Sequence, residues 1–296
     1  MKVKFFSETK KAQKLSFEIK KKVGNILKTG KYTNSDYVKK FEDKFRKYFK
    51  TKYCVAVNNG TSALHLALLA LGINKDDEVI VPSLTFIASV AAVNYVGAKP
   101  VFADINKDDW LINTKIIEKL ITKKTKAIIV VHLHGLMCDM DKIKKIAKKY
   151  NLKIIEDAAQ SICSSYKGKK SGYYSDACAF SFNPMKVLNS YGEAGIVTTN
   201  SKKIYNKLIC LRHAGTIRYK NSFNINNSND ISLNHKIDTI HASILIEKLK
   251  YLKDVLNRRE KISQYYIKHL NNMMLTQTLE PKEIHGRYLF LARFKK

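Results

Sequence analysis

From residue 53 onward, short apolar runs alternate with longer segments in which apolar residues recur at helical spacing. The short runs predict strands over residues 53–57, 79–81, 100–103, 127–131, 153–155, 177–182 and 196–199. The longer segments predict helices, the clearest of them over residues 62–71, 87–96 and 140–150. Because strands that alternate with helices are typical of a sheet covered on both faces, the pattern predicts an α/β fold with a mostly parallel sheet flanked by helices.

The two ends of the chain show a different pattern. Residues 8–50 predict two basic, amphipathic helices, and residues 221–234, which are rich in Asn and Ser, predict a loop. After this loop, apolar residues again recur on one helical face. We therefore predict a large α/β domain over residues 1–235, which includes the N-terminal helices, and a partial, helical C-terminal small domain over residues 236–296.

The charge of the chain raises the alternative of a nucleic-acid-binding protein. The formal net charge is +29, but only seven of the 54 basic residues are Arg, and the lysines are spread over the whole length. Proteins that read nucleic acids usually use Arg for bidentate contacts to bases and phosphates. We therefore interpret the lysines as solvated surface residues and expect no nucleic-acid partner, although a basic surface would also attract an anionic nucleotide substrate.

The remaining composition favours a cytoplasmic protein without a structural metal. The five cysteines are widely spaced and form no Cys-x-x-Cys pair, so neither a disulfide framework nor a zinc site is indicated. His132 and His134 could form a metal pair, but no third ligand has a suitable spacing, and a core role is the simpler interpretation. No apolar run reaches the roughly 18 residues of a membrane span, and Met1–Glu8 turn polar too soon for a signal peptide.

An acidic residue follows one of the buried strands. Asp157 comes directly after Ile154 and Ile155, and a carboxylate in that position must be paired or it takes up a proton. A protonated pyridine nitrogen would be a suitable partner, and a structural salt bridge or a helix cap is the alternative. Gln160, three residues further on, is close enough to reach a hydroxyl group on such a ring.

A lysine follows another strand after a turn. Ser181 and Lys186 flank Asn183-Pro184, and proline ends the strand because it fixes its own φ and restricts the preceding residue. Most lysines are solvated, but one that is desolvated at this edge becomes a nucleophile as its pKa falls. A lysine, a serine and an upstream acid together are what a pyridoxal phosphate (PLP) site requires: a Schiff-base amine, a phosphate ligand and a partner for the pyridinium nitrogen.

Two further segments could complete such a site. Thr61 and Ser62, in Asn59-Gly60-Thr61-Ser62, open a helix after a strand, where free N–H groups and hydroxyls could bind a phosphate. An ordinary helix cap is the alternative. Phe86 follows another strand and could stack on a flat heterocycle, or it could be a core residue.

Taken together, these segments resemble the DegT/DnrJ/EryC1/StrS family of PLP-dependent sugar aminotransferases, which have the aspartate aminotransferase (type I) fold. The resemblance covers most of residues 24–270 in order, and its motifs are Gly30-Lys31-Tyr32, Asn59-Gly60-Thr61-Ser62-Ala63-Leu64, Pro82-Ser83-Leu84-Thr85-Phe86, Gly97-Ala98-Lys99-Pro100-Val101-Phe102-Ala103-Asp104, Glu156-Asp157-Ala158-Ala159-Gln160-Ser161, Ser181-Phe182-Asn183-Pro184-Met185-Lys186, Gly192-Glu193-Ala194-Gly195 and Arg212-His213-Ala214-Gly215.

The resemblance implies a role for each candidate residue. Lys186 would hold PLP as a Schiff base and move protons, and Asp157 would pair with the pyridinium nitrogen. Phe86 would stack on the ring, and Gln160 would approach its phenolic oxygen. The remaining residues would bind phosphate: Thr61, Ser62 and Ser181 within the subunit, and Asn234 on the cofactor of a neighbouring subunit, which implies a homodimer with a shared active site.

The resemblance also implies the reaction. We expect an aminotransferase that takes an amino group, from glutamate, and passes it to a nucleotide-linked keto sugar. A PLP- or PMP-dependent sugar dehydratase of the same family is one alternative, and some of those replace the lysine with histidine. A truncated, non-catalytic regulatory member is the other alternative, since relatives continue for several dozen residues beyond the position of Lys296.

Overall fold

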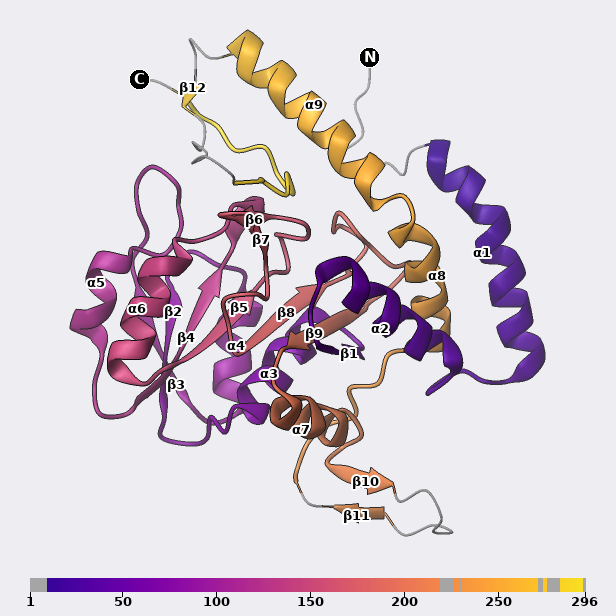
Figure 1. The fold of residues 1–296 in the computed structure, drawn as a ribbon, viewed down its shortest axis with the longest axis horizontal. Helices are drawn as coiled ribbons and strands as arrows, with labels where there is room; N and C mark the ends of the chain where they lie inside the picture. Colours follow the sequence, from indigo (N-terminus) through magenta and orange to yellow (C-terminus); the bar gives the residue numbers. More distant parts are fainter. Residues whose placement is uncertain (1–9, 219–225, 229, 271–273, 276–282, 295–296) are drawn as a thin grey trace.

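The computed structural model of this chain describes residues 10–218, 226–228, 230–270, 274–275 and 283–294 (Figure 1). Its α-helices are α1 Lys10–Thr29, α2 Asp36–Phe49, α3 Gly60–Ala70, α4 Ile87–Tyr95, α5 Thr114–Leu120, α6 Met140–Tyr150, α7 Lys202–Arg212, α8 Thr239–Leu249 and α9 Leu252–Leu270, with a 3-10 helix η1 at Leu133–Gly135. Its strands are β1 Tyr53–Val57, β2 Glu78–Pro82, β3 Lys99–Ala103, β4 Thr125–Val131, β5 Lys153–Asp157, β6 Ser165–Tyr166, β7 Lys169–Lys170, β8 Ala177–Ser181, β9 Gly195–Thr199, β10 Thr216–Arg218, β11 Asn226–Ser228, β12 Met274–Leu275 and β13 Arg293–Phe294.

Seven of these strands form one sheet, in the order β1-β9-β8-β5-β4-β2-β3. The pairs from β8 to β3 are parallel, whereas β9 runs antiparallel to both β8 and β1. The carboxyl ends of the parallel strands therefore meet at one edge of the sheet, where ligands bind in open α/β sheets.

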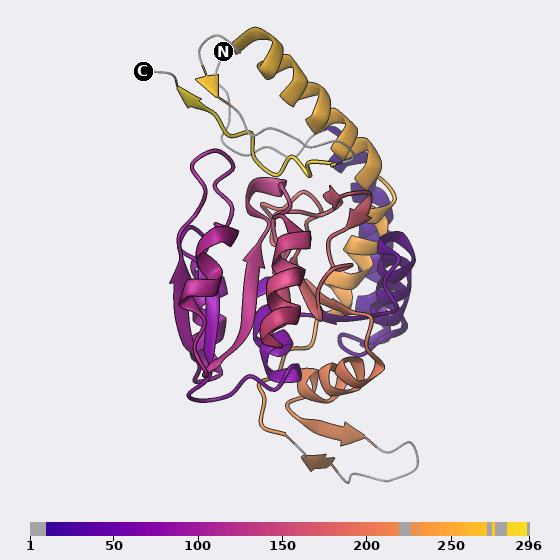
Figure 2. The same ribbon diagram turned by 60° about the vertical axis from the view of Figure 1, so that its left-hand side comes forward.

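Alternating side chains of the sheet enter two apolar clusters, one on each face. Val55 and Val57 of β1 belong to the cluster that includes α3 and the end of α7, whereas Cys54 and Ala56 belong to the cluster that includes α2 and α8. Because successive residues of a strand point to opposite faces, this division shows that the sheet is buried on both sides. Figures 1 and 2 show the helices on the two faces of the sheet, and α9 extending away from it.

The fold confirms the predicted architecture, and it differs from the sequence interpretation in two places. The sheet is mostly parallel and flanked by helices as predicted, but its strand β9 is antiparallel to its neighbours. Residues 226–228, in the predicted loop, pair with β10 to form a two-stranded ribbon. The division into domains at residue 235 stays a prediction, and Met1–Glu8 lie outside the described residues.

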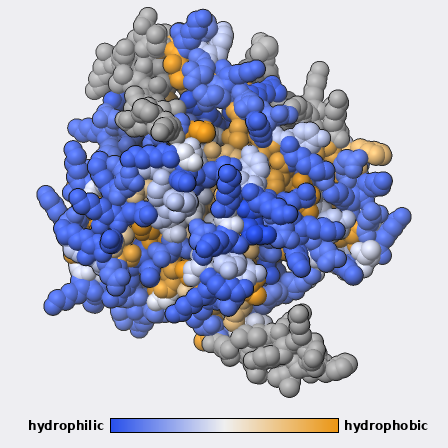
Figure 3. Space-filling view, viewed as in Figure 1, coloured by the Kyte–Doolittle hydropathy of each residue, from blue (hydrophilic) through white to orange (hydrophobic). Residues whose placement is uncertain are grey.

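The surface agrees with the interpretation of the lysines as solvated. Figure 3 shows hydrophilic residues over most of one face, interrupted by smaller apolar areas.

All five cysteines are buried as free thiols. Within the described residues, no helix has both the length and the apolar character needed to cross a bilayer.

Candidate active site

Lys186 lies in a tight turn between β8 and β9. Its N–H donates to the carbonyl of Asn183 at 2.8 Å, one turn earlier. The base of the turn is closed by two backbone hydrogen bonds of 2.7 Å, from Phe182 N–H to the carbonyl of Ala194 and from Ser190 N–H to the carbonyl of Phe182. The lysine is therefore held by a short, closed loop at the ligand-binding edge of the sheet, as the Asn183-Pro184 sequence predicted.

The environment of the Lys186 amine has opposing effects on its charge. Burial lowers the pKa of Lys186, while the carboxylates of Asp157 and Glu193 act in the opposite direction, and the net shift is downward. The Lys186 Nζ lies 4.6 Å from the centre of the Tyr288 ring. A partly desolvated amine with a lowered pKa is the form in which lysine acts as a nucleophile.

Asp157 lies at the end of β5 with 6% of its surface exposed. The Ser89 hydroxyl donates to its Oδ2 at 2.7 Å, and the N–H of Ala159 donates to its Oδ1 at 3.1 Å. The Thr85 and Ser89 hydroxyls lie 2.8 Å apart. Asp157 was predicted from the sequence, whereas Ser89 was not. The available signal for Ser89 was its spacing, since it is a buried serine four residues after Thr85 in a mostly apolar helix.

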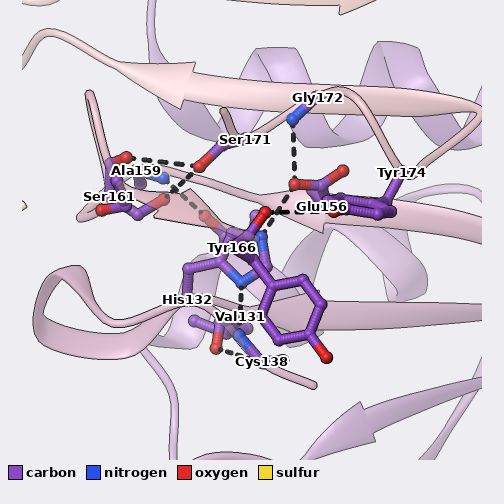
Figure 4. Close-up of polar contacts among 12 residues, drawn as sticks. Val131, His132, Cys138, Glu156, Ala159, Ser161, Tyr166, Ser171, Gly172 and Tyr174 are labelled. Carbon is purple, nitrogen blue, oxygen red and sulfur yellow. Dashed lines mark hydrogen bonds and ion pairs between the residues drawn. The ribbon is translucent and has the colours of Figure 1, made fainter. Parts of the chain in front are cut away.

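A fully buried hydrogen-bonded pair joins His132 to Glu156, the residue before Asp157 in the chain (Figure 4). The His132 Nε2 is 2.8 Å from Glu156 Oε2, and both side chains have no exposed surface. The N–H of Cys138 donates to His132 Nδ1 at 3.2 Å, so the ring proton is on Nε2 and points at Glu156. Gly172 N–H donates to the same carboxylate oxygen at 2.9 Å. His132 thus has a structural partner, in agreement with its interpretation as a core residue.

The N-terminus of α3 lies against the end of β8. A Cβ atom on Gly60 would lie 2.7 Å from the Ser181 Cβ, so only glycine allows this approach. The Asn59 side chain accepts from the Ser62 N–H at 2.7 Å and is the helix cap. The contact therefore brings Ser181 against the first turn of α3, which carries Thr61 and Ser62 and whose N–H groups without an acceptor in the helix attract anions.

The other three predicted residues lie at separate points of this edge. Phe86 is the N-cap residue that precedes α4, and 67% of its surface is exposed, so it is not a core residue. Gln160 accepts with Oε1 from the His134 N–H at 2.7 Å. Asn234 is exposed, and its carbonyl accepts from the Asn58 side chain at 3.4 Å, beyond the end of β1.

The side chains at this edge fit PLP. They offer an amine with a lowered pKa, a buried carboxylate held by two donors, an exposed aromatic ring, and hydroxyls beside the N-terminus of a helix. These are the groups that bind the aldehyde, the pyridine nitrogen, the ring face and the phosphate of that cofactor.

A family model for the DegT/DnrJ/EryC1/StrS aminotransferase family matches residues 13–295. The chain belongs to this family. This DegT/DnrJ/EryC1/StrS aminotransferase is 40% identical over 260 residues to GDP-perosamine synthase of Escherichia coli O157:H7. The match covers 88% of this chain and 70% of that protein. The chain is 41% identical over 281 residues to dTDP-3-amino-3,6-dideoxy-alpha-D-galactopyranose transaminase of Aneurinibacillus thermoaerophilus, covering 94% of this chain and 76% of that protein.

Similar solved structures confirm the predicted fold. DesV of S. venezuelae, in complex with a ketimine intermediate, matches with a TM-score of 0.89 and 34% identity, over 95% of this chain and 75% of that one. NtdA of Bacillus subtilis, with bound PMP, matches with a TM-score of 0.89 and 33% identity, over 99% of this chain and 67% of that one. Members of this family use PLP, which confirms the predicted cofactor.

Proposed function

We propose that this chain is a PLP-dependent aminotransferase that converts the keto group of a nucleotide-linked sugar into an amine. The observation that carries the proposal is the partly buried Lys186 at the sheet edge where Asp157 ends β5: burial lowers the pKa of the lysine, and the carboxylates of Asp157 and Glu193 oppose this shift. The similarity to a GDP-perosamine synthase and to a dTDP-amino-sugar transaminase supports a nucleotide sugar as the substrate. The many surface lysines would favour such an anionic molecule.

Each predicted residue has a chemical task in this proposal. When bound, PLP supplies an electron sink for the carbon from which a proton is removed. Asp157, oriented by Ser89 and the Ala159 N–H, would keep a proton on the pyridine nitrogen through its negative charge. The Lys186 Nζ would hold the cofactor and, when released, move a proton between two carbon atoms as base and then acid.

The remaining predicted residues would bind and orient the cofactor. Thr61, Ser62 and Ser181 would donate hydroxyl hydrogen bonds to the phosphate at the N-terminus of α3. Phe86, whose ring is exposed at the start of α4, would stack on one face of the pyridine ring. Gln160, fixed by the His134 N–H, would approach the phenolic oxygen.

The proposal includes a homodimer with a shared site. Large apolar side chains close in the chain to Phe86 and Asn234 are exposed: Leu84 at 43%, Phe86 at 67%, Ile87 at 66%, Leu233 at 64% and Ile231 at 96%. An exposed apolar surface of this kind is typical of a protein interface. Asn234, exposed beside Leu233, would reach the phosphate site of the other subunit. Free buried cysteines agree with a cytoplasmic location, which we also propose.

A spectral experiment tests the cofactor chemistry. Purified protein with PLP should show a visible absorption band that disappears when glutamate is added, as the amino group is transferred to the cofactor. Lys186→Ala should lose this band, whereas the exposed control Lys148→Ala should keep it. An unchanged band in Lys186→Ala would exclude this lysine as the residue that binds PLP.

The substrate class is tested in the reverse direction. The protein should form glutamate from 2-oxoglutarate when it is given GDP-perosamine or dTDP-3-amino-3,6-dideoxy-α-D-galactose, the amino sugars that name its relatives. Simple amino sugars without a nucleotide should react far more slowly. Loss of a hydroxyl group as water from a nucleotide-linked keto sugar, with no amine formed, would favour the dehydratase instead.

A further inference from the structure

Residues 283–289 form a segment that packs onto the loops beside the candidate site. Ile284 and Ser165 exchange two backbone hydrogen bonds, of 3.0 and 2.9 Å. The N–H of Gly286 donates to the carbonyl of Gly135 at 2.7 Å. The 283–289 segment is thus joined by backbone contacts to η1 and β6, which are far from it in sequence.

Two side chains of α9, those of Arg259 and Glu260, also form hydrogen bonds with the 283–289 segment. The Arg259 guanidinium donates from Nη1 to the carbonyls of Arg287 and Tyr288, at 3.0 and 3.1 Å. The Arg287 guanidinium donates in turn to both carboxylate oxygens of Glu260, at 2.7 and 3.2 Å. Bidentate hydrogen bonds from a charged group fix the position and orientation of the bonded groups more firmly than single neutral hydrogen bonds.

The contact between the segment and η1 leaves no room for side chains. A Cβ atom on Gly135, whose φ is +105°, would lie 2.9 Å from the Arg287 nitrogen, and a Cβ on Gly286 would lie 2.6 Å from the Ser164 Oγ. Two glycines therefore allow the backbones to approach closely. The place of Tyr288, next in the chain after Arg287, is set by this packing.

Tyr288 is half-buried, and its ring faces Lys186. The 4.6 Å between the Lys186 Nζ and the ring centre is within the range in which an aromatic face attracts a cation. Among the residues that the structure describes, Asp157 and Glu193 act on the charge of this lysine, and Arg259 acts on Tyr288. The desolvated amine therefore has two carboxylates and one aromatic ring to stabilise its positive charge.

We propose that Tyr288 is a positioning residue for Lys186: its ring face holds the ammonium of this lysine whenever the amine is not bonded to the cofactor. The proposal rests on the proposed function and deepens it, because transamination frees this amine in every catalytic cycle. A free lysine side chain has many rotamers, and an aromatic face at a fixed position keeps the amine close to the atoms between which it moves a proton.

The test measures the protonation of Lys186 in the full chain without PLP. Protein is labelled briefly with isotopically light acetic anhydride over a range of pH, then unfolded and labelled completely with the heavy reagent. Mass spectrometry of the peptide with Lys186 gives the pH at which its amine becomes reactive, with the exposed Lys148 as the reference within the same molecule.

Removal of the ring should make the amine reactive at a lower pH. In Tyr288→Leu we expect the midpoint for Lys186 to fall by about half to one pH unit, the size of a partly desolvated cation–π contact. Tyr288→Phe keeps the ring and should retain the original midpoint. As a matched control, Tyr173→Leu removes a ring that lies 4.9 Å from Lys169 and should leave Lys186 unchanged.

Two results would overturn the proposal: an unchanged midpoint in Tyr288→Leu, or an equal fall in Tyr288→Phe, which would assign the effect to the hydroxyl. If Tyr288→Leu does not fold, Tyr288→Met supplies a second ringless side chain, and circular dichroism checks both. The labelling requires neither PLP nor turnover, so a protein that fails to transaminate can still support or refute the role of Tyr288.

Discussion

Lys186 interacts with two parts of the chain that are built in different ways. On one side is the sheet, where Asp157 ends a buried strand and is held by Ser89 and a backbone N–H. On the other side is the 283–289 segment, where Tyr288 is held by the side chain of Arg259 and by backbone contacts to loops. The sheet side is fixed by the strands of the apolar core, and the other side is fixed by polar contacts between distant residues.

The roles that we propose for the two sides differ in the same way as their construction. The carboxylate of Asp157 is buried, directional and part of the rigid sheet, so it suits a permanent contact with one cofactor atom. The ring of Tyr288 offers a broad, weakly directional attraction, which suits an amine that must leave and return. Three substitutions test this contrast.

The largest effect should come from the sheet side. Asp157→Ala removes the charge that would keep a proton on the pyridine nitrogen, and we expect the rate of the half-reaction with glutamate to fall by about 100- to 1000-fold. Stopped-flow absorbance measures this rate, and the exposed Asp108→Ala is the control. A rate within threefold of the unmodified protein would remove Asp157 from the mechanism.

A smaller effect should follow from loosening the other side. Arg259→Met removes both hydrogen bonds to the carbonyls of Arg287 and Tyr288, so local opening of the 283–289 segment should become easier by about 2 kcal/mol. Amide hydrogen exchange of Ile284 and Gly286 measures this opening. Arg258 is the exposed neighbour of Arg259, and Arg258→Met should leave the amide exchange unchanged. Equal exchange rates in the two variants would show that the 283–289 segment does not depend on Arg259.

The smallest effect concerns Lys186 itself. Burial lowers its pKa in the folded protein, so between the folded and unfolded pKa values the unfolded chain binds more protons. Stability of the unmodified protein should therefore rise with pH across that interval. Lys186→Met should be more stable by about 1 kcal/mol at pH 7, and this advantage should shrink toward pH 10.

Urea unfolding at a series of pH values measures this trend. An advantage of Lys186→Met that is constant from pH 7 to pH 10 would show that packing, and not the charge of the lysine, sets the difference. The same series on Lys148→Met, at an exposed position, gives the baseline.

The residues on the sheet side of Lys186 could be predicted because the features that mark them lie close together in the sequence. Asp157 and Lys186 each follow an apolar strand within a few residues, and a polar residue at a strand end is visible in the chain itself. The direction of β9 was not visible, since the run from Gly195 to Thr199 is equally apolar in either orientation. Gln160 was identified, but its hydrogen bond to the His134 backbone depends on tertiary packing.

The contact of Tyr288 with Lys186 could not be predicted, because it depends on residues that are far apart in the sequence. The 283–289 segment has no helical or strand period, and its position depends on Gly135, Ser165 and Arg259, which lie far from it along the chain. Tyr288 is one of 16 tyrosines, and nothing adjacent to it marks its neighbour in space as Lys186. Contacts of this kind become visible only when the whole chain is folded.

The buried His132–Glu156 pair has a consequence for how β4 and β5 align. Residues 127–131 are buried on both faces of the sheet, so a shift of one or two positions would still place apolar side chains on each face. The observed alignment sets Val130 opposite Glu156. With this alignment the Glu156 carboxylate lies within hydrogen-bond distance of the His132 ring. In any shifted pairing, Glu156 would be buried without that donor, at a high cost in free energy. One polar contact thus gives two otherwise interchangeable apolar strands a single alignment.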